Sequence, residues 1–197
     1  PVSVKLRAGI ESRDFDYLLR FVEGLFDAGA AWITIHPRTA EQRRKGLLDW
    51  NLIRKLKASF RAAGRVPEII GNGDVQCHED IVALFEESDC DRVMVGRAMM
   101  AKPWLIRNEP DPDLETQGVY FGEFLLKVLD EMRAHYPWEA GRRRMLFLIV
   151  WSKPWVAFGE FLQGRVQAST DYDSMEAALR KFFSQPQPMV KRTSLRA

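Results

Sequence analysis

The sequence is poor in cysteine and has no long apolar run. Its 197 residues include two cysteines, Cys77 and Cys90. Two cysteines cannot form the disulfide framework of a small secreted domain, so their number favours a reducing compartment. The longest apolar run, residues 145–151, falls well short of the roughly 18 residues that span a bilayer, and no signal-peptide pattern is visible. We therefore expect a soluble, cytoplasmic protein without membrane contact.

A strong net charge is also lacking. The formal charge is +2, with 46% hydrophobic and 28% charged residues, which is an ordinary globular composition for one or two domains. The small total hides an asymmetry, because residues 117–197 carry 12 Lys and Arg against 8 Asp and Glu. A basic excess in the C-terminal part is compatible with a polyanionic partner.

Strand and helix patterns alternate over the first 107 residues. Strands are predicted at residues 1–7, 31–36, 66–70 and 91–95. Each is followed by a segment with helical apolar spacing, so the pattern predicts four βα units and a parallel sheet with helices outside. A closed eight-unit barrel typically needs ~250 residues. The sheet is therefore either open or the C-terminal half of a (β/α)8 TIM barrel.

The pattern changes after residue 107. Residues 108–118 contain prolines and acids without apolar periodicity, which predicts a linker. Residues 119–185 have the composition and spacing of a helical domain. Residues 186–197 are polar and basic, and predict a flexible tail.

Polar residues or glycines follow each predicted strand. In strand order they are Lys5 and Arg7, His36 and Arg38, Asn72 with Gly73 and Asp74, and Gly96 with Arg97. The carboxyl ends of parallel strands face the ligand, so these groups should converge at one edge. Glycine lets a ligand approach the backbone, and amides at a helix start favour an anion. The two glycine loops therefore resemble a phosphate site.

Each of these groups also has a purely structural interpretation. Lys5 and Arg97 could pair with nearby carboxylates, and His36 could be a hydrogen-bonded core histidine. Residues 72–74 could form a tight turn in which Asp74 caps the next helix. The convergence of four strand ends favours a ligand site over these readings.

The cation triplets and the aromatic stripe have simpler interpretations. Two cation triplets are expected to lie on the solvated surface, with contact to phosphates as the alternative. They are Arg43, Arg44 and Lys45, and Arg142, Arg143 and Arg144. Cys77 beside His78 lacks a second pair at zinc spacing, so no metal site is predicted. Core positions are expected for Met99, Met100, Trp151, Trp155, Phe158 and Phe161.

Several motifs occur together in one known family. They are residues 2–7, residues 33–39 leading to Gly46, Asp49 and Trp50, residues 72–74, and residues 93–97 leading to Pro103 and Trp104. In this order and spacing, residues 1 to about 107 resemble the C-terminal part of bacterial tRNA-dihydrouridine synthases. The resemblance implies FMN at the rim of a TIM barrel, NADPH as reductant, and reduction of a uridine C5–C6 bond in tRNA.

The resemblance also implies roles for individual residues. FMN would contact Lys5 at its ring, lie against His36, and be held at its phosphate by Asn72, Gly73, Asp74, Gly96 and Arg97. Arg7 and Arg38 would face the cavity that the uridine enters. Contacts with tRNA would fall to Arg43, Arg44, Arg142, Arg143 and Arg144, the last three within a helical tRNA-binding domain.

One part of the family's machinery has no counterpart here. The family's general acid is a Cys in an Asn-x-x-Cys-Pro loop, and neither Cys77 nor Cys90 lies in such a loop. We therefore expect no catalytic residue in this chain, a fragment that is inactive alone, and a full-length enzyme that is monomeric. The alternatives are another FMN-dependent barrel oxidoreductase of a small molecule, and a non-catalytic tRNA-binding module.

Overall fold

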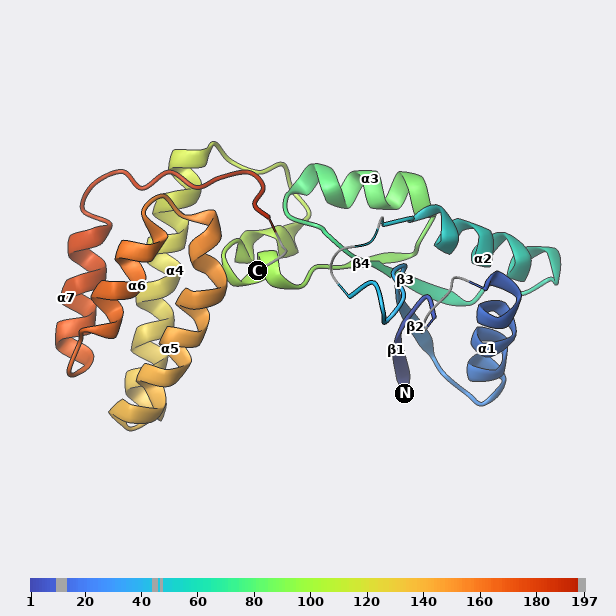
Figure 1. The fold of residues 1–197 in the computed structure, drawn as a ribbon, viewed down its shortest axis with the longest axis horizontal. Coiled ribbons are helices and arrows are strands. Elements are labelled where there is room, and N and C mark those ends of the chain that lie inside the picture. Colours follow the sequence, from blue (N-terminus) through green and yellow to red (C-terminus); the bar gives the residue numbers. More distant parts are fainter. Residues whose placement is uncertain (10–13, 44–45, 47, 195–197) are drawn as a thin grey trace. The chain divides into compact units, whose positions relative to one another are not determined.

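A computed structural model describes residues 1–9, 14–43, 46 and 48–194 (Figure 1). These residues divide into two compact units, Pro1–Gly96 and Arg97–Ser194. The division falls earlier than the predicted boundary after residue 107. The reason is that two short 3-10 helices, η1 (Arg97–Met100) and η2 (Pro103–Arg107), pack on each other, and η1 packs on helix α5 (Trp138–Ser152) of the second unit.

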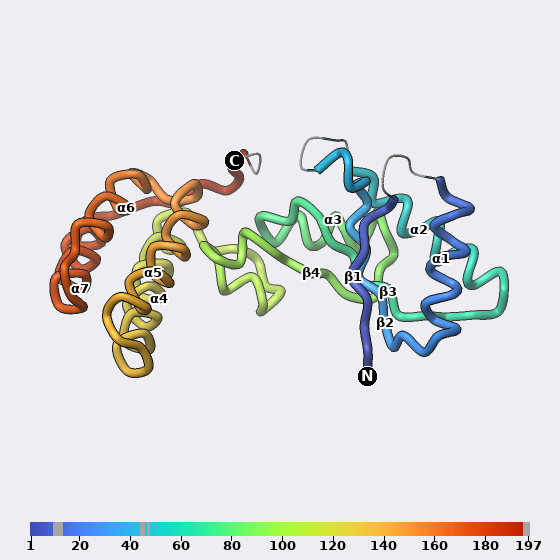
Figure 2. Tube along the Cα trace, turned by 60° about the horizontal axis from the view of Figure 1, so that its bottom comes forward, coloured from blue at the N-terminus to red at the C-terminus, as the bar shows by residue number. Residues whose placement is uncertain are grey.

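The first unit contains a parallel sheet of four strands within its described residues. The strands are β1 (Ser3–Arg7), β2 (Trp32–His36), β3 (Glu68–Asn72) and β4 (Arg92–Met94), in the order β1-β2-β3-β4. Helices α1 (Phe15–Asp27), α2 (Asn51–Ala62) and α3 (His78–Ser88) connect them, and α2 contacts both of the others (Figure 2). All four predicted strands are confirmed, and the arrangement is consistent with a partial TIM barrel.

A buried lysine ties helix α2 to the sheet. Lys57 Nζ lies 2.6 Å from Asp91 Oδ1, and Asp91 Oδ2 accepts a hydrogen bond of 2.8 Å from the Ile69 amide. The Asp91 carboxylate, directly before β4, therefore binds both α2 and β3. Because Lys57 is buried, its ammonium depends on this partner for its stability.

Helices make up most of the second unit's described secondary structure. After η1 and η2 come α4 (Leu114–His135), α5, the 3-10 helix η3 (Lys153–Trp155), α6 (Gly159–Gln167) and α7 (Tyr172–Phe182). Each α-helix packs on two others, in the cyclic order α4, α5, α6, α7. Their inward side chains form the core of this unit and include Phe121, Leu125, Leu129, Met145, Ile149, Leu162, Val166, Met175 and Leu179.

The predicted linker and tail both differ from the structure. Helix α4 begins at Leu114, inside the segment expected to be a linker, because the Asp113 carboxylate accepts hydrogen bonds from the amides of Glu115 and Thr116. Part of the expected tail is also fixed. Met189 is buried, and its amide donates to the Leu114 carbonyl at 2.9 Å, while Val190 bonds to Trp155.

The aromatic stripe was expected in the core, and half of that prediction is wrong. Trp155 is buried and Trp151 is half-buried, but Phe158 is 76% exposed and Phe161 is 54% exposed. Pro154 predicts a break in this helix, and the chain does leave α5 at η3 and start α6 after a turn. This break redirects the two phenylalanines away from the core.

No helix in the described part of the chain has the length and apolar character needed to cross a bilayer.

Replacing Asp91 should destabilise the first unit. Asp91→Ala leaves the Lys57 ammonium buried without its partner. The expected loss is about 2–3 kcal/mol in urea unfolding, less than the roughly 3–5 kcal/mol for a fully buried pair, since the Asp91 side chain is 36% exposed. The exposed pair of Arg65 with Asp27 provides the control, and Asp27→Ala should cost less than about 1 kcal/mol. Equal effects would contradict this account.

The contribution of Asp91 should also depend on pH. Burial raises its pKa, but the hydrogen bonds from Lys57 and the Ile69 amide outweigh that effect and lower the pKa from 3.8. A lowered carboxyl pKa means that the stabilisation is present above about pH 4 and is lost as the pH falls further. The stability difference between the original chain and Asp91→Ala should therefore shrink below about pH 4.

Candidate functional site

Parallel pairing brings polar side chains to one edge of the first unit's sheet. The register aligns Arg7 with His36 across β1 and β2, and Ile35 with Gly71 across β2 and β3, so Asn72 leaves the sheet at the same level. Lys5 lies two residues before Arg7 on the same strand. The structure therefore places the predicted groups of the first three strands at a common edge.

Arg38 links the loops that follow β2 and β3. Its Nη1 and Nη2 donate to the two carboxylate oxygens of Asp74 at 2.8 and 2.5 Å, and its Nε donates to the Gly46 carbonyl at 2.7 Å. Arg38 is 6% exposed. The bidentate pair and the carbonyl contact use the planar fork of the guanidinium, so Arg38 fixes the position of both loops. The family resemblance implies that Arg38 faces the cavity for the uridine, whereas its guanidinium is bound to Asp74 and to the Gly46 carbonyl.

The turn at residues 72–74 has a backbone that favours glycine. Gly73 has φ +128, and a Cβ there would lie 2.8 Å from Leu48 Cδ1 and 3.4 Å from His36 Nε2. Asp74 follows with φ 53. Asn72 Nδ2 donates to the Met94 carbonyl at 2.7 Å, which ties the end of β3 to β4. Both the positive φ and the close approach of Leu48 therefore require glycine at position 73.

His36 lies between these loops in a partly buried position. Its pKa falls from 6.5 to about 4, first because burial disfavours the charged ring, and then because of the charges of Arg7, Arg38 and Lys5, which Asp74 only partly opposes. The imidazole is therefore neutral at pH 7. Its Nδ1 is buried and has no hydrogen-bond partner among the described residues. Such an atom in a native site calls for a partner.

Two further cations border His36. Arg7 donates from Nε to the Arg38 carbonyl at 3.3 Å and from Nη2 to the Arg43 carbonyl. Burial lowers the pKa of Arg7, and the neighbouring Arg38 adds to this effect. The pKa of Lys5 is lowered for the same reason, burial first and then the charge of Arg7. The edge therefore concentrates positive charge, which favours an anionic ligand.

The remaining predicted residues lie elsewhere or are engaged differently. Gly96 is the last residue of the first unit, and Arg97 starts η1 in the second. Arg44 lies outside the described residues. On α5, Arg142 Nη2 donates to the Gln167 carbonyl at 2.8 Å, Arg144 lies 4.2 Å from the Tyr136 ring centre, and Arg143 is exposed.

Sequence reasoning missed two groups at the edge. Leu48 packs close to Gly73, and the Gly46 carbonyl accepts from Arg38. Neither contact has a local signal, because both depend on how the loop after β2 folds back.

Both cysteines are buried, and burial raises their pKa values, that of Cys77 to about 12. Neither thiol is suited to proton transfer near neutral pH.

The environment of His36 predicts a measurable titration. Its C2 proton in NMR should titrate with a pKa near 4, assigned by its loss in His36→Gln. Because this value lies below the unfolded value of 6.5, the stability contributed by His36 should fall as the pH drops between these two values. Arg7→Gln should raise the pKa by removing a neighbouring positive charge. Arg20→Gln, an exposed site on α1, should leave it unchanged; equal shifts would contradict the assigned cause.

Comparisons with known proteins agree on one family. The family model described as Dihydrouridine synthase matches residues 1–181. A probable tRNA-dihydrouridine synthase of Aquifex aeolicus is 41% identical over 133 residues, which cover 67% of this chain and 40% of that protein. Those of Mycobacterium tuberculosis and Mycobacterium leprae are 29% and 30% identical, over 91% and 92% of this chain and 46% and 47% of their own lengths. The chain thus spans less than half the length of these relatives.

Proposed function

The chain belongs to the dihydrouridine synthase family, a family of oxidoreductases, and on that premise we propose that it forms part of a flavin-dependent tRNA-dihydrouridine synthase. The whole protein would use FMN and NADPH to reduce the C5–C6 bond of a uridine in tRNA. Residues 1–107 would be half of a TIM barrel, and the helical residues 119–185 would bind tRNA. The protein would act in the cytoplasm as a monomer.

The observation that carries this proposal is the positively charged edge around Gly73. FMN ends in a phosphate, which needs backbone amides and cations close by. Gly73 keeps the turn free of a side chain, because a Cβ there would collide with Leu48 Cδ1. His36 Nδ1, which has no partner among the described residues, lies at the same edge. The residues therefore fit the group. Asn72, Gly73 and Asp74 would hold the phosphate, together with Gly96, which follows β4 in the same unit.

Arg38 makes the presence of Asp74 compatible with that role. A free carboxylate about 4 Å from a phosphate would repel it by roughly 4 kcal/mol per unit charge at an effective dielectric constant of 20. The bidentate pair with Arg38 neutralises the carboxylate. The Asp74 backbone can then approach the phosphate without this penalty, so Arg38 acts as a positioning residue.

The other residues at the edge would bind and orient. FMN, when bound, supplies the hydride acceptor and donor chemistry. Lys5 would hold a fixed positive charge near the ring and stabilise negative charge there. His36, neutral at pH 7, would use Nδ1 for a hydrogen bond. Arg7 would face the uridine, and Arg43, Arg44 and the cations of α5 would contact tRNA phosphates.

Reduction of the uridine needs a proton donor as well as a hydride. The family supplies the proton from a Cys, and the buried Cys77 and Cys90 do not provide one. We therefore expect the 197-residue chain to form no dihydrouridine in unmodified tRNA when supplied with FMN and NADPH. Detection of dihydrouridine by mass spectrometry would contradict this, and would require another acid within the chain.

Flavin binding provides the direct test of the site. FMN fluorescence should be quenched on titration with the chain. Gly73→Ala should weaken binding at least tenfold, about 1.4 kcal/mol, because it places a methyl group against Leu48 in a strained backbone. Gly64→Ala is the matched control, since Gly64 also has positive φ (+70) but nothing within 4 Å of its Cβ position. Equal losses, or no flavin binding by the original chain, would contradict the assigned site.

A further inference from the structure

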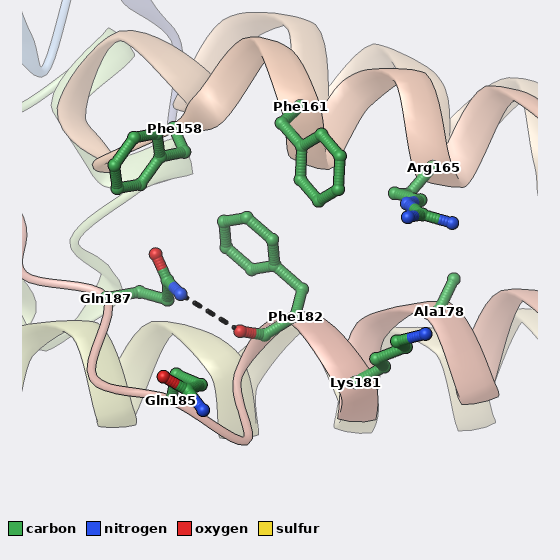
Figure 3. Close-up of a pocket in the computed structure, with 8 residues that line it drawn as sticks. All are labelled: Phe158, Phe161, Arg165, Ala178, Lys181, Phe182, Gln185 and Gln187. Carbon is green, nitrogen blue, oxygen red and sulfur yellow. Dashed lines mark hydrogen bonds between the residues drawn. The ribbon is translucent and has the colours of Figure 1, made fainter.

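The second unit contains an aromatic pocket apart from the residues assigned above. It lies between α6, α7 and the segment that follows α7, and has a volume of about 470 Å³ (Figure 3). That volume falls within the roughly 300–1,000 Å³ typical of small-ligand sites. The lining residues that matter here are Phe158, Phe161, Arg165, Lys181, Phe182 and Gln187.

Two exposed phenylalanines form the outer wall. Phe158 is 76% exposed, with φ 56, a conformation that bulky residues rarely adopt. The turn behind it is tight, because a Cβ at Gly159 would lie 2.2 Å from the Lys153 carbonyl oxygen. Phe161 is 54% exposed and tilts by 30° against the buried Phe182. The fold thus holds aromatic faces toward solvent at a cost in both backbone strain and hydration.

The rim of the pocket is positively charged. The Arg165 guanidinium lies 4.8 Å from the centre of the Phe161 ring, and Lys181 stands on the facing helix. No Asp or Glu is among the eight residues that line the pocket. Within the described part of the chain, neither cation pairs with a carboxylate. The acids nearby on these helices are engaged elsewhere, Glu160 with Lys153 and Glu176 with Arg180.

A hydrogen-bond acceptor lies at the inner end. Gln187 Nε2 donates to the Phe182 carbonyl at 3.1 Å, which fixes the orientation of the amide. Its Oε1 is buried and has no partner among the described residues. In Figure 3 this oxygen stands on the side of the amide that faces Phe158. A ligand that carries an N–H group would satisfy it.

We propose that this pocket binds one base of tRNA, stacked on Phe158 and Phe161. Arg165 and Lys181 would contact the flanking phosphates, and Gln187 would accept from an N–H on the base edge. Aromatic faces beside unpaired cations are the combination that binds single-stranded RNA, because each base has a π-face and each linkage a charge. An apolar peptide would leave both cations without a partner. The inference rests on the proposed function, in which tRNA is the partner.

The pocket is formed entirely by residues of the second unit. The flavin edge lies in the first unit, whereas all six residues named here lie in the second. An unstacked base in a tRNA loop is the form that such a pocket can accept. Stacking would fix the register of tRNA on the helical unit, in addition to the sequence-independent phosphate contacts.

Binding of an unmodified tRNA transcript to the 197-residue chain tests the proposal, with fluorescence anisotropy as the readout. Phe161→Ala should weaken binding roughly five- to 150-fold, the range expected for loss of one stacked base. Phe161→Trp should retain it. Phe147→Ala is the matched control, because Phe147 is 60% exposed on α5 of the same unit. It should leave tRNA affinity unchanged.

The salt dependence of tRNA binding distinguishes the contribution of the cations from that of the aromatic side chains. Arg165→Gln should reduce the slope of log affinity against log salt by roughly 0.7–0.9, the value for one phosphate contact. Arg180→Gln removes a charge already paired with Glu176 and should change the slope less. Phe161→Ala should lower tRNA affinity without changing the slope of log affinity against log salt. A general loss of folding would instead remove the phosphate contacts as well and reduce that slope.

The possible outcomes are distinct. Equal tRNA affinity for Phe161→Ala and the original chain would overturn the base pocket and leave the proposed function intact. A loss of self-association in Phe161→Ala, with tRNA binding unchanged, would assign the pocket to a second copy of the chain. Absence of tRNA binding by the original chain would overturn both proposals. Absence of FMN binding with the Phe161 effect present would overturn the flavin site alone.

Discussion

The parallel register of β1, β2 and β3 determines which side chains meet in the first unit. Because all three strands run in one direction, the loops that follow them leave the sheet at one edge. Arg38 and Asp74 are 36 residues apart in sequence, and they form a bidentate pair only because β2 and β3 are neighbours. Shifting one strand by a single residue would turn its side chains to the other face, so the polar groups would no longer meet at this edge.

The edge concentrates like charges, and the structure limits the cost in two ways. Arg38 is compensated by Asp74, and His36 stays neutral because burial and its cationic neighbours oppose protonation. Burial lowers the pKa values of Lys5 and Arg7, and a neighbouring arginine adds to the effect in each case. Charges held in place before a ligand arrives need not be reorganised when it binds, which is the property that makes such sites effective toward anions.

Periodicity and turn residues were sufficient to predict the strands and the convergence of Lys5, His36 and Asn72, because these are properties of successive βα units. They were not sufficient for contacts made by distant segments. No pattern near Met189 signals that its amide bonds to Leu114, and the tail was therefore predicted to be flexible. Pro154 predicts a break before Phe158 and Phe161, but no local pattern signals that both rings lie exposed beyond it. The pairing of Arg38 likewise depends on a loop that only the folded chain defines.

The order β1-β2-β3-β4 has a consequence for synthesis of the chain on the ribosome. Each strand pairs with its predecessor after an interval of 22 to 36 residues, from Ile70 to Arg92 at the shortest and from Trp32 to Glu68 at the longest. At elongation rates of roughly 5–20 residues per second, each new strand presents an unpaired edge for about one to seven seconds before the next arrives. The sheet can thus grow in the order of translation, with one growing edge exposed at any moment to mispairing or to a chaperone.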